Sequence, residues 1–194
     1  MNAAATCLAP VSLVSGGVLG VRRAAPADRE PLLQMFGRCS ADTRYRRFHG
    51  PVKTLPAGYL TEALSGCPFH YALVAWHQEQ GEPEPEPESA GPGEAPALAA
   101  AGPPARLVAL ASCRLVAEGA AELGLLVEDA WQRQGAGTRL LRDLVAYADS
   151  IGVRVLEAQL LAEQSWITSL LRPYGPGRLR SSRHGVMTVT VRRG

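Results

Sequence analysis

The sequence predicts a single α/β domain in which a mixed, mostly antiparallel sheet is flanked by about four helices. A chain of 194 residues is long enough for one domain with a sizeable core. Segments with the period of strands and segments with the period of helices follow one another in the order β-α-α-β-β-β-α-β-α-β-β. Near the C-terminus polar and apolar residues alternate, and the apolar ones are Met187, Val189 and Val191.

The N-terminal half is expected to place two helices after its first strand. Residues 1–17 are assigned to a flexible extension, and the domain itself is assigned to residues 18–194. The first strand spans 18–23, a helix spans 27–39, and a second, short helix ends over 60–64. The apolar side of the first helix consists of Leu32, Leu33, Met35 and Phe36.

An insertion is predicted over about 79–105, where the sequence is rich in Pro, Glu, Ala and Gly. Such a composition buries little apolar area and does not hold one conformation. The flanking segments 71–76 and 106–113 are both typical of strands. We therefore expect a hairpin with a lengthened turn, which costs little because loop-closure entropy grows only logarithmically with length.

The C-terminal half is expected to alternate strands and helices. A strand over 118–127 leads into a helix over 137–150, and a strand over 153–160 leads into a helix over 165–171. Two further strands over 179–182 and 186–192 form a terminal hairpin. The apolar face of the longer helix consists of Leu140, Leu141, Leu144, Val145 and Ala148.

Composition excludes several classes of function. A net charge of +2 is too balanced to indicate nucleic acid as a partner. The four cysteines form no Cys-x-x-Cys pair and have no histidine at ligand spacing, so we expect no metal site and reduced thiols in the cytoplasm. The apolar N-terminus has no basic residue before Arg22, which disfavours a signal peptide, and no segment is long enough to cross a membrane.

The most informative segment runs from Glu122 to Thr138. It combines an apolar strand with one carboxylate, a turn, a loop with Gly135 and Gly137, and the first turn of an amphipathic helix. Free N–H groups and a partial positive charge at a helix N-terminus attract phosphate, and glycines permit close approach. The segment lacks the patterns of a Walker loop and of a dinucleotide-binding fingerprint. It therefore predicts chemistry on another phosphorylated cofactor.

The run Gln132-Arg-Gln-Gly-Ala-Gly137 resembles the acyl-CoA signature of the GNAT acetyltransferases, Gln/Arg-x-x-Gly-x-Gly/Ala. The resemblance implies the GNAT fold, an acetyl-CoA-dependent N-acetyltransferase, and loop amides that hold the CoA pyrophosphate. It also implies that the backbone of Val127 pairs with the pantetheine arm. The residues it assigns to binding acetyl-CoA, the acyl donor, are Leu125, Leu126, Val127, Gln132, Arg133, Gln134, Gly135, Ala136, Gly137, Thr138 and Gln164.

A second likeness is narrower. The stretch Cys39 to His49, the pair Ala121-Glu122, and Asp129-x-Trp-Gln132 are similar to bacterial protein lysine acetyltransferases of the Pat type. This resemblance implies that the acceptor is a protein lysine and that an acyl-CoA synthetase is a substrate.

Glu122 is the candidate general base. Removing a proton from the attacking ammonium requires such a group, and Glu122 lies on a strand among apolar neighbours. The resemblance assigns a general-base glutamate to this strand position. The alternative is a solvent-facing glutamate, which is also the interpretation favoured for Glu118 and Glu128. A backbone N–H near Leu125 to Val127, where the strand diverges from its neighbour, is the candidate oxyanion donor.

The sequence departs from the family pattern at the general acid. GNAT enzymes often carry a tyrosine at the position of Leu171, and Tyr174 is out of register with it. Gln164 is expected either to bond the pantetheine arm or to start a helix. Trp131 is expected to pack under the loop, with adenine contact as the alternative. The arginines of 44–47 are expected to contact either an anionic ligand or solvent.

Three functions remain open at this stage. The favoured one is acetylation of a protein lysine. The second keeps the fold but changes the acceptor to a small amine. The third is an acyl-CoA-binding sensor without catalysis, which the absence of the tyrosine favours and the presence of Glu122 disfavours.

Overall fold

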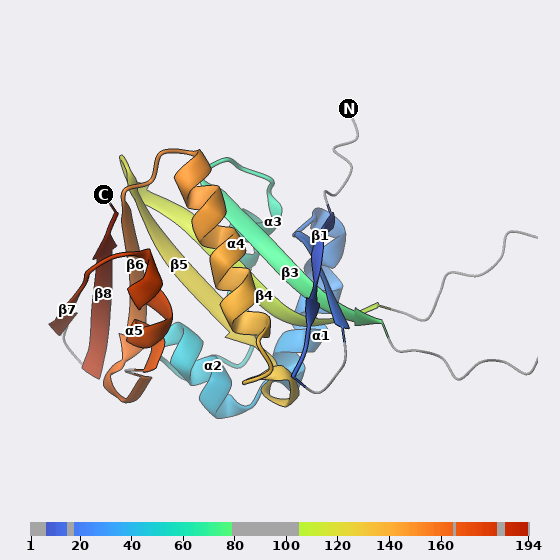
Figure 1. The fold of residues 1–194 in the computed structure, drawn as a ribbon. Helices are drawn as coiled ribbons and strands as arrows, with labels where there is room; N and C mark the ends of the chain where they lie inside the picture. Colours follow the sequence, from blue (N-terminus) through green and yellow to red (C-terminus); the bar gives the residue numbers. More distant parts are fainter. Residues whose placement is uncertain (1–6, 15–17, 79–104, 165, 182–184, 194) are drawn as a thin grey trace, which may run out of the picture.

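The computed structural model describes residues 7–14, 18–78, 105–164, 166–181 and 185–193. Its centre is an eight-stranded sheet with the order β1-β2-β3-β4-β5-β6-β8-β7 (Figure 1). The strands are β1 (Cys7–Ser12), β2 (Val18–Arg23), β3 (His70–Gln78), β4 (Ala105–Ala117), β5 (Ala120–Val127), β6 (Val155–Leu161), β7 (Gly177–Ser181) and β8 (Val186–Arg192). The helices are α1 (Arg29–Arg38), α2 (Ala41–Phe48), α3 (Ala57–Leu64), α4 (Ala136–Ser150) and α5 (Trp166–Leu171).

The predicted α/β class and the mostly antiparallel sheet are confirmed. Every strand pair is antiparallel except β5 with β6, which run parallel and are joined by α4. A parallel pair needs such a crossover, whereas the antiparallel pairs β4–β5 and β7–β8 are joined directly along the chain. Apart from Ala105, the expected insertion at 79–105 lies outside the described residues.

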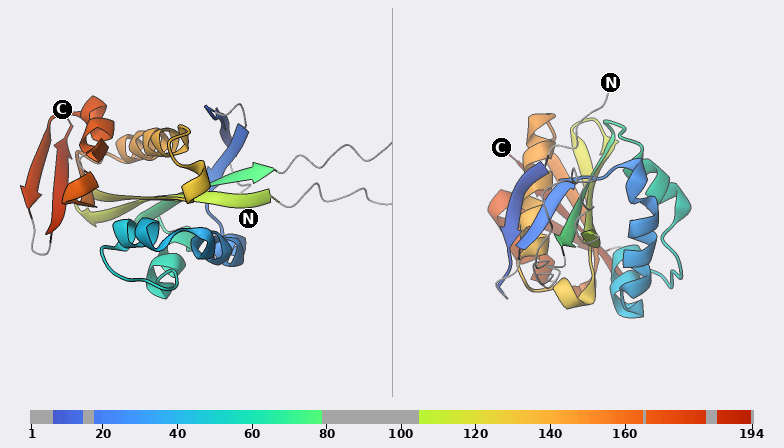
Figure 2. Two further views of the ribbon diagram at one scale, coloured as in Figure 1. Left: turned by 90° about the horizontal axis from the view of Figure 1, so that it is seen from below. Right: turned by 90° about the vertical axis from the view of Figure 1, so that its right-hand side faces the viewer.

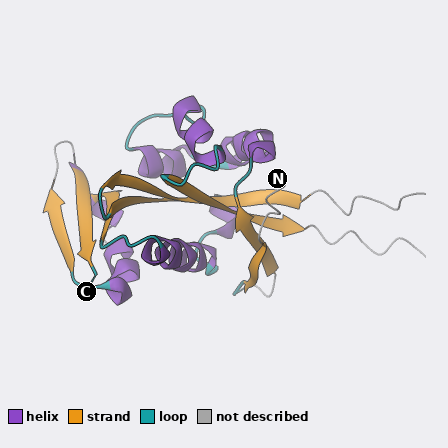
Figure 3. Ribbon diagram, turned by 90° about the horizontal axis from the view of Figure 1, so that it is seen from above, coloured by secondary structure: helices purple, strands orange, loops and turns teal. Residues whose placement is uncertain are grey.

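Helices cover both faces of the sheet. Figure 2 shows α4 and α5 on one face and α1, α2 and α3 on the other, and Figure 3 shows the same layers from the opposite side. The sheet accordingly borders two apolar cores. One contains the buried face of α4, with Leu140 and Leu144, and the other contains Leu32 and Phe36 of α1. None of the described helices is both long and apolar enough to cross a membrane.

The N-terminal boundary of the domain differs from the sequence prediction. Residues 7–12, which were assigned to a flexible extension, form β1 and pair with β2. The side chains of Val11 and Leu13 are buried, and Arg139 of α4 donates hydrogen bonds to the carbonyls of Ala9 and Pro10. The prediction failed because this strand is short and carries little alternation, so its order depends on partners that are distant in sequence.

The described residues form five α-helices, where about four were predicted, and the additional one is α2. Helix α2 is rich in charged residues and has no fully buried residue, so it does not carry the run of apolar residues by which the other helices were recognised. Its start is fixed by Ser40, whose hydroxyl accepts a hydrogen bond from the Thr43 N–H at 3.1 Å. His49 ends it in the left-handed region, with φ of 55°.

His70 is a buried titratable group beneath α3. Its ring is only 4% exposed and packs edge-on against Tyr59, and Glu62 lies 3.5 Å from its Nδ1 atom. Burial lowers the pKa of His70 below 6.5, although the nearby Glu62 carboxylate acts in the opposite direction. The unfolded chain therefore binds more protons than the folded one when the pH falls through this range.

We predict that His70 makes the protein less stable in mild acid. The stability it contributes is present above pH 6.5 and is lost as the pH falls toward the lower pKa of the folded state. Thermal melts at pH 7.5 and 5.5 should show a smaller drop in Tm for His70→Asn than for the wild type. Equal drops in the two proteins would contradict the prediction, whatever the offset between their curves.

Candidate functional site

The main feature of the site is a gap in the sheet between β5 and β6. Their parallel pairing ends at Leu123 and Ala158, whereas β5 continues to pair with β4 as far as Val127. A cleft of about 940 Å³ lies at this gap. Its walls include Leu141 and Leu144 of α4 on one face of the sheet and the end of α2 on the other. The cleft therefore connects the two faces of the sheet. It lies where β5 diverges from β6, and a divergence of β5 from its neighbour was predicted.

Two residues of β5 turn their backbone toward the gap. The N–H of Glu128 donates to the Val108 carbonyl, and hydrogen bonding alternates along an antiparallel pair. Leu126 and Gly124 therefore bond to β4, whereas Leu125 and Val127 direct their N–H and C=O groups to the opposite side. There β6 no longer pairs with them. These are the backbone groups that a ligand in the cleft can reach.

The loop before α4 is shaped by its glycines. Gly135 has φ of 95°, which favours glycine, and Arg133 is also left-handed, with φ of 57°. Gly137 lies so close to β5 that a Cβ atom there would be 3.1 Å from Leu125. The first N–H groups of α4 thus lie at the end of the cleft, where an anion is stabilised by the helix N-terminus.

The structure brings most of the predicted site residues together around this cleft. Those that line it are Glu122, Leu125, Leu126, Val127, Gln132, Arg133, Gly135, Gly137, Thr138 and Gln164. Two predicted residues do not line it. Ala136, the first residue of α4, is buried in the core, and the side chain of Gln134 donates to the Ala130 carbonyl at 2.8 Å. Their N–H groups still belong to the loop.

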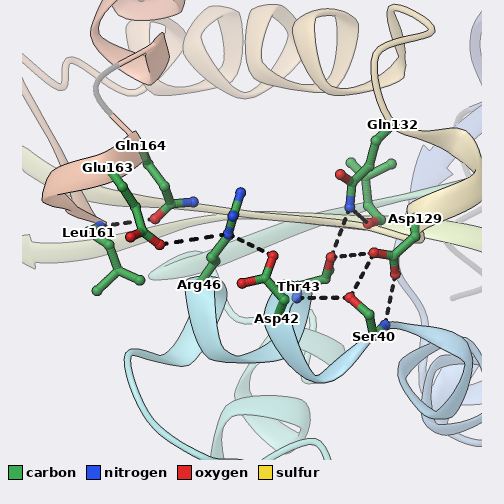
Figure 4. Close-up of polar contacts among 10 residues, drawn as sticks. Ser40, Asp42, Thr43, Arg46, Asp129, Gln132, Leu161, Glu163 and Gln164 are labelled. Atoms are coloured by element: carbon green, nitrogen blue, oxygen red, sulfur yellow. Dashed lines mark hydrogen bonds and ion pairs between the residues drawn. The ribbon is translucent and has the colours of Figure 1, made fainter.

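Gln132 joins the loop to α2 instead of facing the loop itself (Figure 4). Its amide nitrogen donates to the Val127 carbonyl at 2.9 Å and to the Thr43 hydroxyl at 3.0 Å. The carbonyl of Val127 therefore already accepts one hydrogen bond, and the expected backbone pairing of this residue with pantetheine stays a prediction. The Val127 N–H and the second lone pair of its carbonyl oxygen are left for such a contact.

Asp129 reinforces the same junction (Figure 4). Its carboxylate accepts hydrogen bonds from the Ser40 N–H at 2.8 Å, the Ser40 hydroxyl at 2.7 Å and the Thr43 hydroxyl at 2.8 Å. Partial burial raises the pKa of Asp129, but these hydrogen bonds outweigh it and hold the pKa below its usual 3.8. Asp129 is thus an anionic acceptor that ties the start of α2 to the end of β5.

Glu128 is not the solvated acid that the sequence suggested. It is 4% exposed and forms ion pairs with Arg38, at 3.0 Å, and with Arg106. Arg38 also donates to the Leu107 carbonyl at 2.7 Å. A buried carboxylate needs such partners, and this one fixes the end of α1 and the start of β4 to the end of β5.

Glu122 lines the cleft, but its surroundings are more polar than predicted. Arg114, its direct neighbour on β4, donates to it at 2.6 Å, and the Glu122 side chain is 25% exposed. On the other side its partner on β6 is a second carboxylate, Glu157. Glu122 is therefore an accessible acid in an ion pair, and sequence spacing did not predict Arg114 or Glu157 beside it.

Helix α2 and its C-cap His49 supply further residues of the site, of which sequence analysis considered only the arginines, as contacts for an anionic ligand or solvent. Thr43, Arg46, Arg47, Phe48 and His49 all line the cleft. Burial, and then the nearby Arg47 guanidinium, lower the pKa of His49. The similarity of residues 39–49 to Pat-type enzymes was the available signal. It did not say which side chains face the cleft, because α2 was not recognised as a helix.

The remaining candidates have structural partners. Gln164 is buried at the cleft wall, and its side-chain oxygen accepts a hydrogen bond from the Leu161 N–H at 2.9 Å. Leu171 is buried and lines the cleft, whereas Tyr174 packs against the core and Arg193. Trp131, which was expected to pack under the loop, packs against the core and contacts the His77 ring. Among the described residues that line the cleft, none is a tyrosine or a cysteine.

No cluster of His, Cys, Asp and Glu suited to a metal ion occurs within the described ranges. Cys39, Cys67 and Cys113 are free thiols. Burial raises the pKa of both Cys39 and Cys113 to about 11, so neither is a ready nucleophile.

Solved structures with the same fold include several acyltransferases. The chain is similar to the GNAT domain of S. lividans PAT, with a TM-score of 0.70 and 22% identity over 95% of this chain and 96% of that one. It is similar to yncA from Salmonella typhimurium, solved with its cofactor acetyl-CoA, with a TM-score of 0.61 and 14% identity over 91% and 94% of the two chains.

A third similar structure is a larger protein. It is the cAMP-binding acyltransferase from Mycobacterium smegmatis, with a TM-score of 0.55 and 22% identity. The match covers 98% of this chain but only 48% of that one, so the chain spans about half of its length. At these identities the similarity establishes the fold. Among curated proteins, none matches the sequence.

The family is established by a direct match of the sequence. Residues 60–165, which include β3, β4, β5, the loop and α4, match the acetyltransferase (GNAT) family model. This range is more than half of the chain and contains the strand, the loop and the helix that form the cleft. The chain therefore belongs to the GNAT acetyltransferase family.

Proposed function

We propose that the protein transfers an acetyl group from acetyl-CoA to a lysine side chain of a protein, with Glu122 as general base and without a covalent enzyme intermediate. One observation supports this above all. Glu122 and the free backbone groups of β5 line the same cleft as the N-terminus of α4. A donor held at the helix end and an acceptor entering from the α2 face would thus meet in the gap of the sheet.

Several features suit acetyl-CoA as the donor. The loop has the glycine geometry that lets a phosphate approach the first N–H groups of α4, and Gly137 leaves no side chain in that space. Leu125 and Val127 have backbone groups available for an extended polar arm. The family match and the acetyl-CoA-bound yncA structure agree with this choice.

Acetyl-CoA supplies a thioester, whose thiolate is a good leaving group. The protein has to accept a proton from the attacking amine and to stabilise negative charge on the carbonyl oxygen. Glu122 is the accessible carboxylate for the first task, and Arg114 holds it in place. The N–H groups of Leu125 and Val127 are the donors for the second. No tyrosine lines the described cleft, so departure of the thiolate without an acid from the protein fits this site.

The protein lysine acceptor rests on the similarity of residues 39–49 and 121–132 to Pat-type enzymes and on the fold shared with S. lividans PAT. By the same similarity we propose an acyl-CoA synthetase as the substrate. Residues 40–49 form α2 and its caps, and several of them line the cleft, so we propose this as the side from which the acceptor enters. A test with a protein substrate, a free amine and acetyl-CoA alone distinguishes this function from small-amine acetylation and from a non-catalytic sensor.

We expect Gly137→Glu to weaken binding of CoA at least tenfold, which is about 1.4 kcal/mol. The new side chain would meet Leu125 and would bring negative charge to the helix N-terminus. Isothermal titration calorimetry measures the effect. The control is Gly58→Glu in α3, where an added Cβ meets nothing within 4 Å and the change in charge is the same. Equal affinity in the two variants would remove this loop from the cofactor site.

We expect Glu122→Gln to lower kcat by about 10²- to 10⁴-fold, the usual contribution of a general base. The glutamine keeps the size of the side chain but cannot accept the proton, and acetyl-CoA affinity should hardly change. Release of free thiol with a lysine substrate gives the rate. Glu118→Gln, at the exposed turn between β4 and β5, is the matched control. A near-normal rate for Glu122→Gln would direct attention to His49.

A further inference from the structure

We propose that Arg47 is an anion-binding residue on the acceptor side of the cleft, and that the preferred acceptor carries a carboxylate close to the amine that is acetylated. This inference rests on the proposed acetyl transfer, because it concerns the same cleft. It adds a chemical property of the acceptor, and it assigns that property to one side chain of α2.

The arginines of α2 differ in how their charge is used. Arg44 donates to the carbonyls of Cys39 and Lys53, and its guanidinium lies over the Phe36 ring. Arg46 forms ion pairs with Asp42 at 2.9 Å and with Glu163 at 4.0 Å, and Figure 4 shows it between these two carboxylates. Neither of these residues needs an anion from a ligand.

Arg47 has no such partner in the described part of the chain. Its guanidinium lies 4.9 Å from the centre of the Phe48 ring and 5.0 Å from that of the Tyr59 ring, and no hydrogen bond or ion pair engages it there. Glu122, the acid on strand β5, is paired with Arg114 and not with Arg47. The rings hold the planar group in place while its five N–H donors remain available.

The position of Arg47 depends on Gly124. A Cβ atom on Gly124 would lie 2.2 Å from Nη2 of Arg47, so the absence of a side chain on β5 makes room for the guanidinium. Both residues line the cleft. Gly124 follows Glu122 by two positions on the same face of the strand, which places them about 7 Å apart. The site thus presents a proton acceptor and a cation on the same face of β5, at positions two residues apart along the strand.

This arrangement suits an acceptor that carries an amine and a carboxylate close together. An amine directed at Glu122 would bring such a carboxylate to the guanidinium, which binds carboxylates in a bidentate manner. The carboxylate has two possible sources, an acidic side chain next to the target lysine or the carboxylate of a small amino acid. Both sources share one chemical feature, which is a carboxylate close to the amine that is acetylated.

The test compares matched acceptors that differ only in this acid. The peptides Gly-Lys-Asp-Gly and Gly-Lys-Asn-Gly represent the protein source, and 6-aminohexanoate and hexylamine represent the small-molecule source. Binding to the CoA-loaded protein by NMR titration and acetyl transfer by release of thiol are measured for each. We expect at least tenfold tighter binding and a correspondingly lower KM for the acidic member of one pair.

In the same measurements, Arg47→Met should abolish this preference and leave the KM for acetyl-CoA unchanged. Arg142→Met, at an exposed position of α4 outside the cleft, removes an equal charge and should keep the preference. Should Arg47→Met fail to fold, Gly124→Ala displaces the guanidinium without removing it and should also weaken the preference. A purely structural arginine would alter stability but not this ratio.

The outcomes separate the two proposals. A preference that is absent in both pairs, or that persists in Arg47→Met and Gly124→Ala, overturns the anion site. A preference that depends on Arg47 but is seen only in binding, with no acetyl transfer to any acceptor, supports the anion site and overturns the proposed activity. A preference confined to the peptides or to the small amines supports the anion site and identifies the source of the acid.

Discussion

The separation of β5 from β6 after Leu123 and Ala158 is the constraint on which the rest of the site depends. A sheet that opens in its interior leaves backbone groups without strand partners, and such groups are costly when buried. Two glutamines provide part of the compensation. Gln132 donates to the Val127 carbonyl at the end of β5, and Gln164 accepts from the Leu161 N–H at the end of β6. The N–H groups that remain are therefore available to a ligand.

The gap could not keep its shape unless the elements around it were held together. Glu128 follows β5 directly, and its ion pairs with Arg38 and Arg106 fix it to α1 and β4. The next residue, Asp129, caps the start of α2 through Ser40 and Thr43. One short turn after β5 thus positions the helix on the acceptor face and leads into the loop on the other face. A shift of the loop before α4 would therefore be transmitted to α2 through this turn.

Sequence reasoning recovered the parts of the protein that have a local signal. The apolar face of α4 follows helical spacing, and the strand of Val189 and Val191 follows a two-residue period, so both were predicted. The loop was found because Gly135 has a backbone conformation that favours glycine. By contrast, β1 is ordered by pairing with β2 and by Arg139, which no local pattern reveals. Helix α2 was missed because it lies on the surface of the sheet without a buried side chain.

The distribution of charge around the gap explains why those missed elements matter for function. Cross-strand pairing places Arg114, Glu122 and Glu157 side by side on adjacent strands, an order that follows from sheet topology and not from sequence spacing. Arg114 balances only one of the two carboxylates, so Glu122 and Glu157 together still attract an approaching ammonium ion. Arg47 adds a positive charge at Gly124 that the described residues do not neutralise. A site with a carboxylate and a guanidinium at fixed positions discriminates among acceptors more strongly than either charge alone would, because a ligand has to satisfy both charges at once.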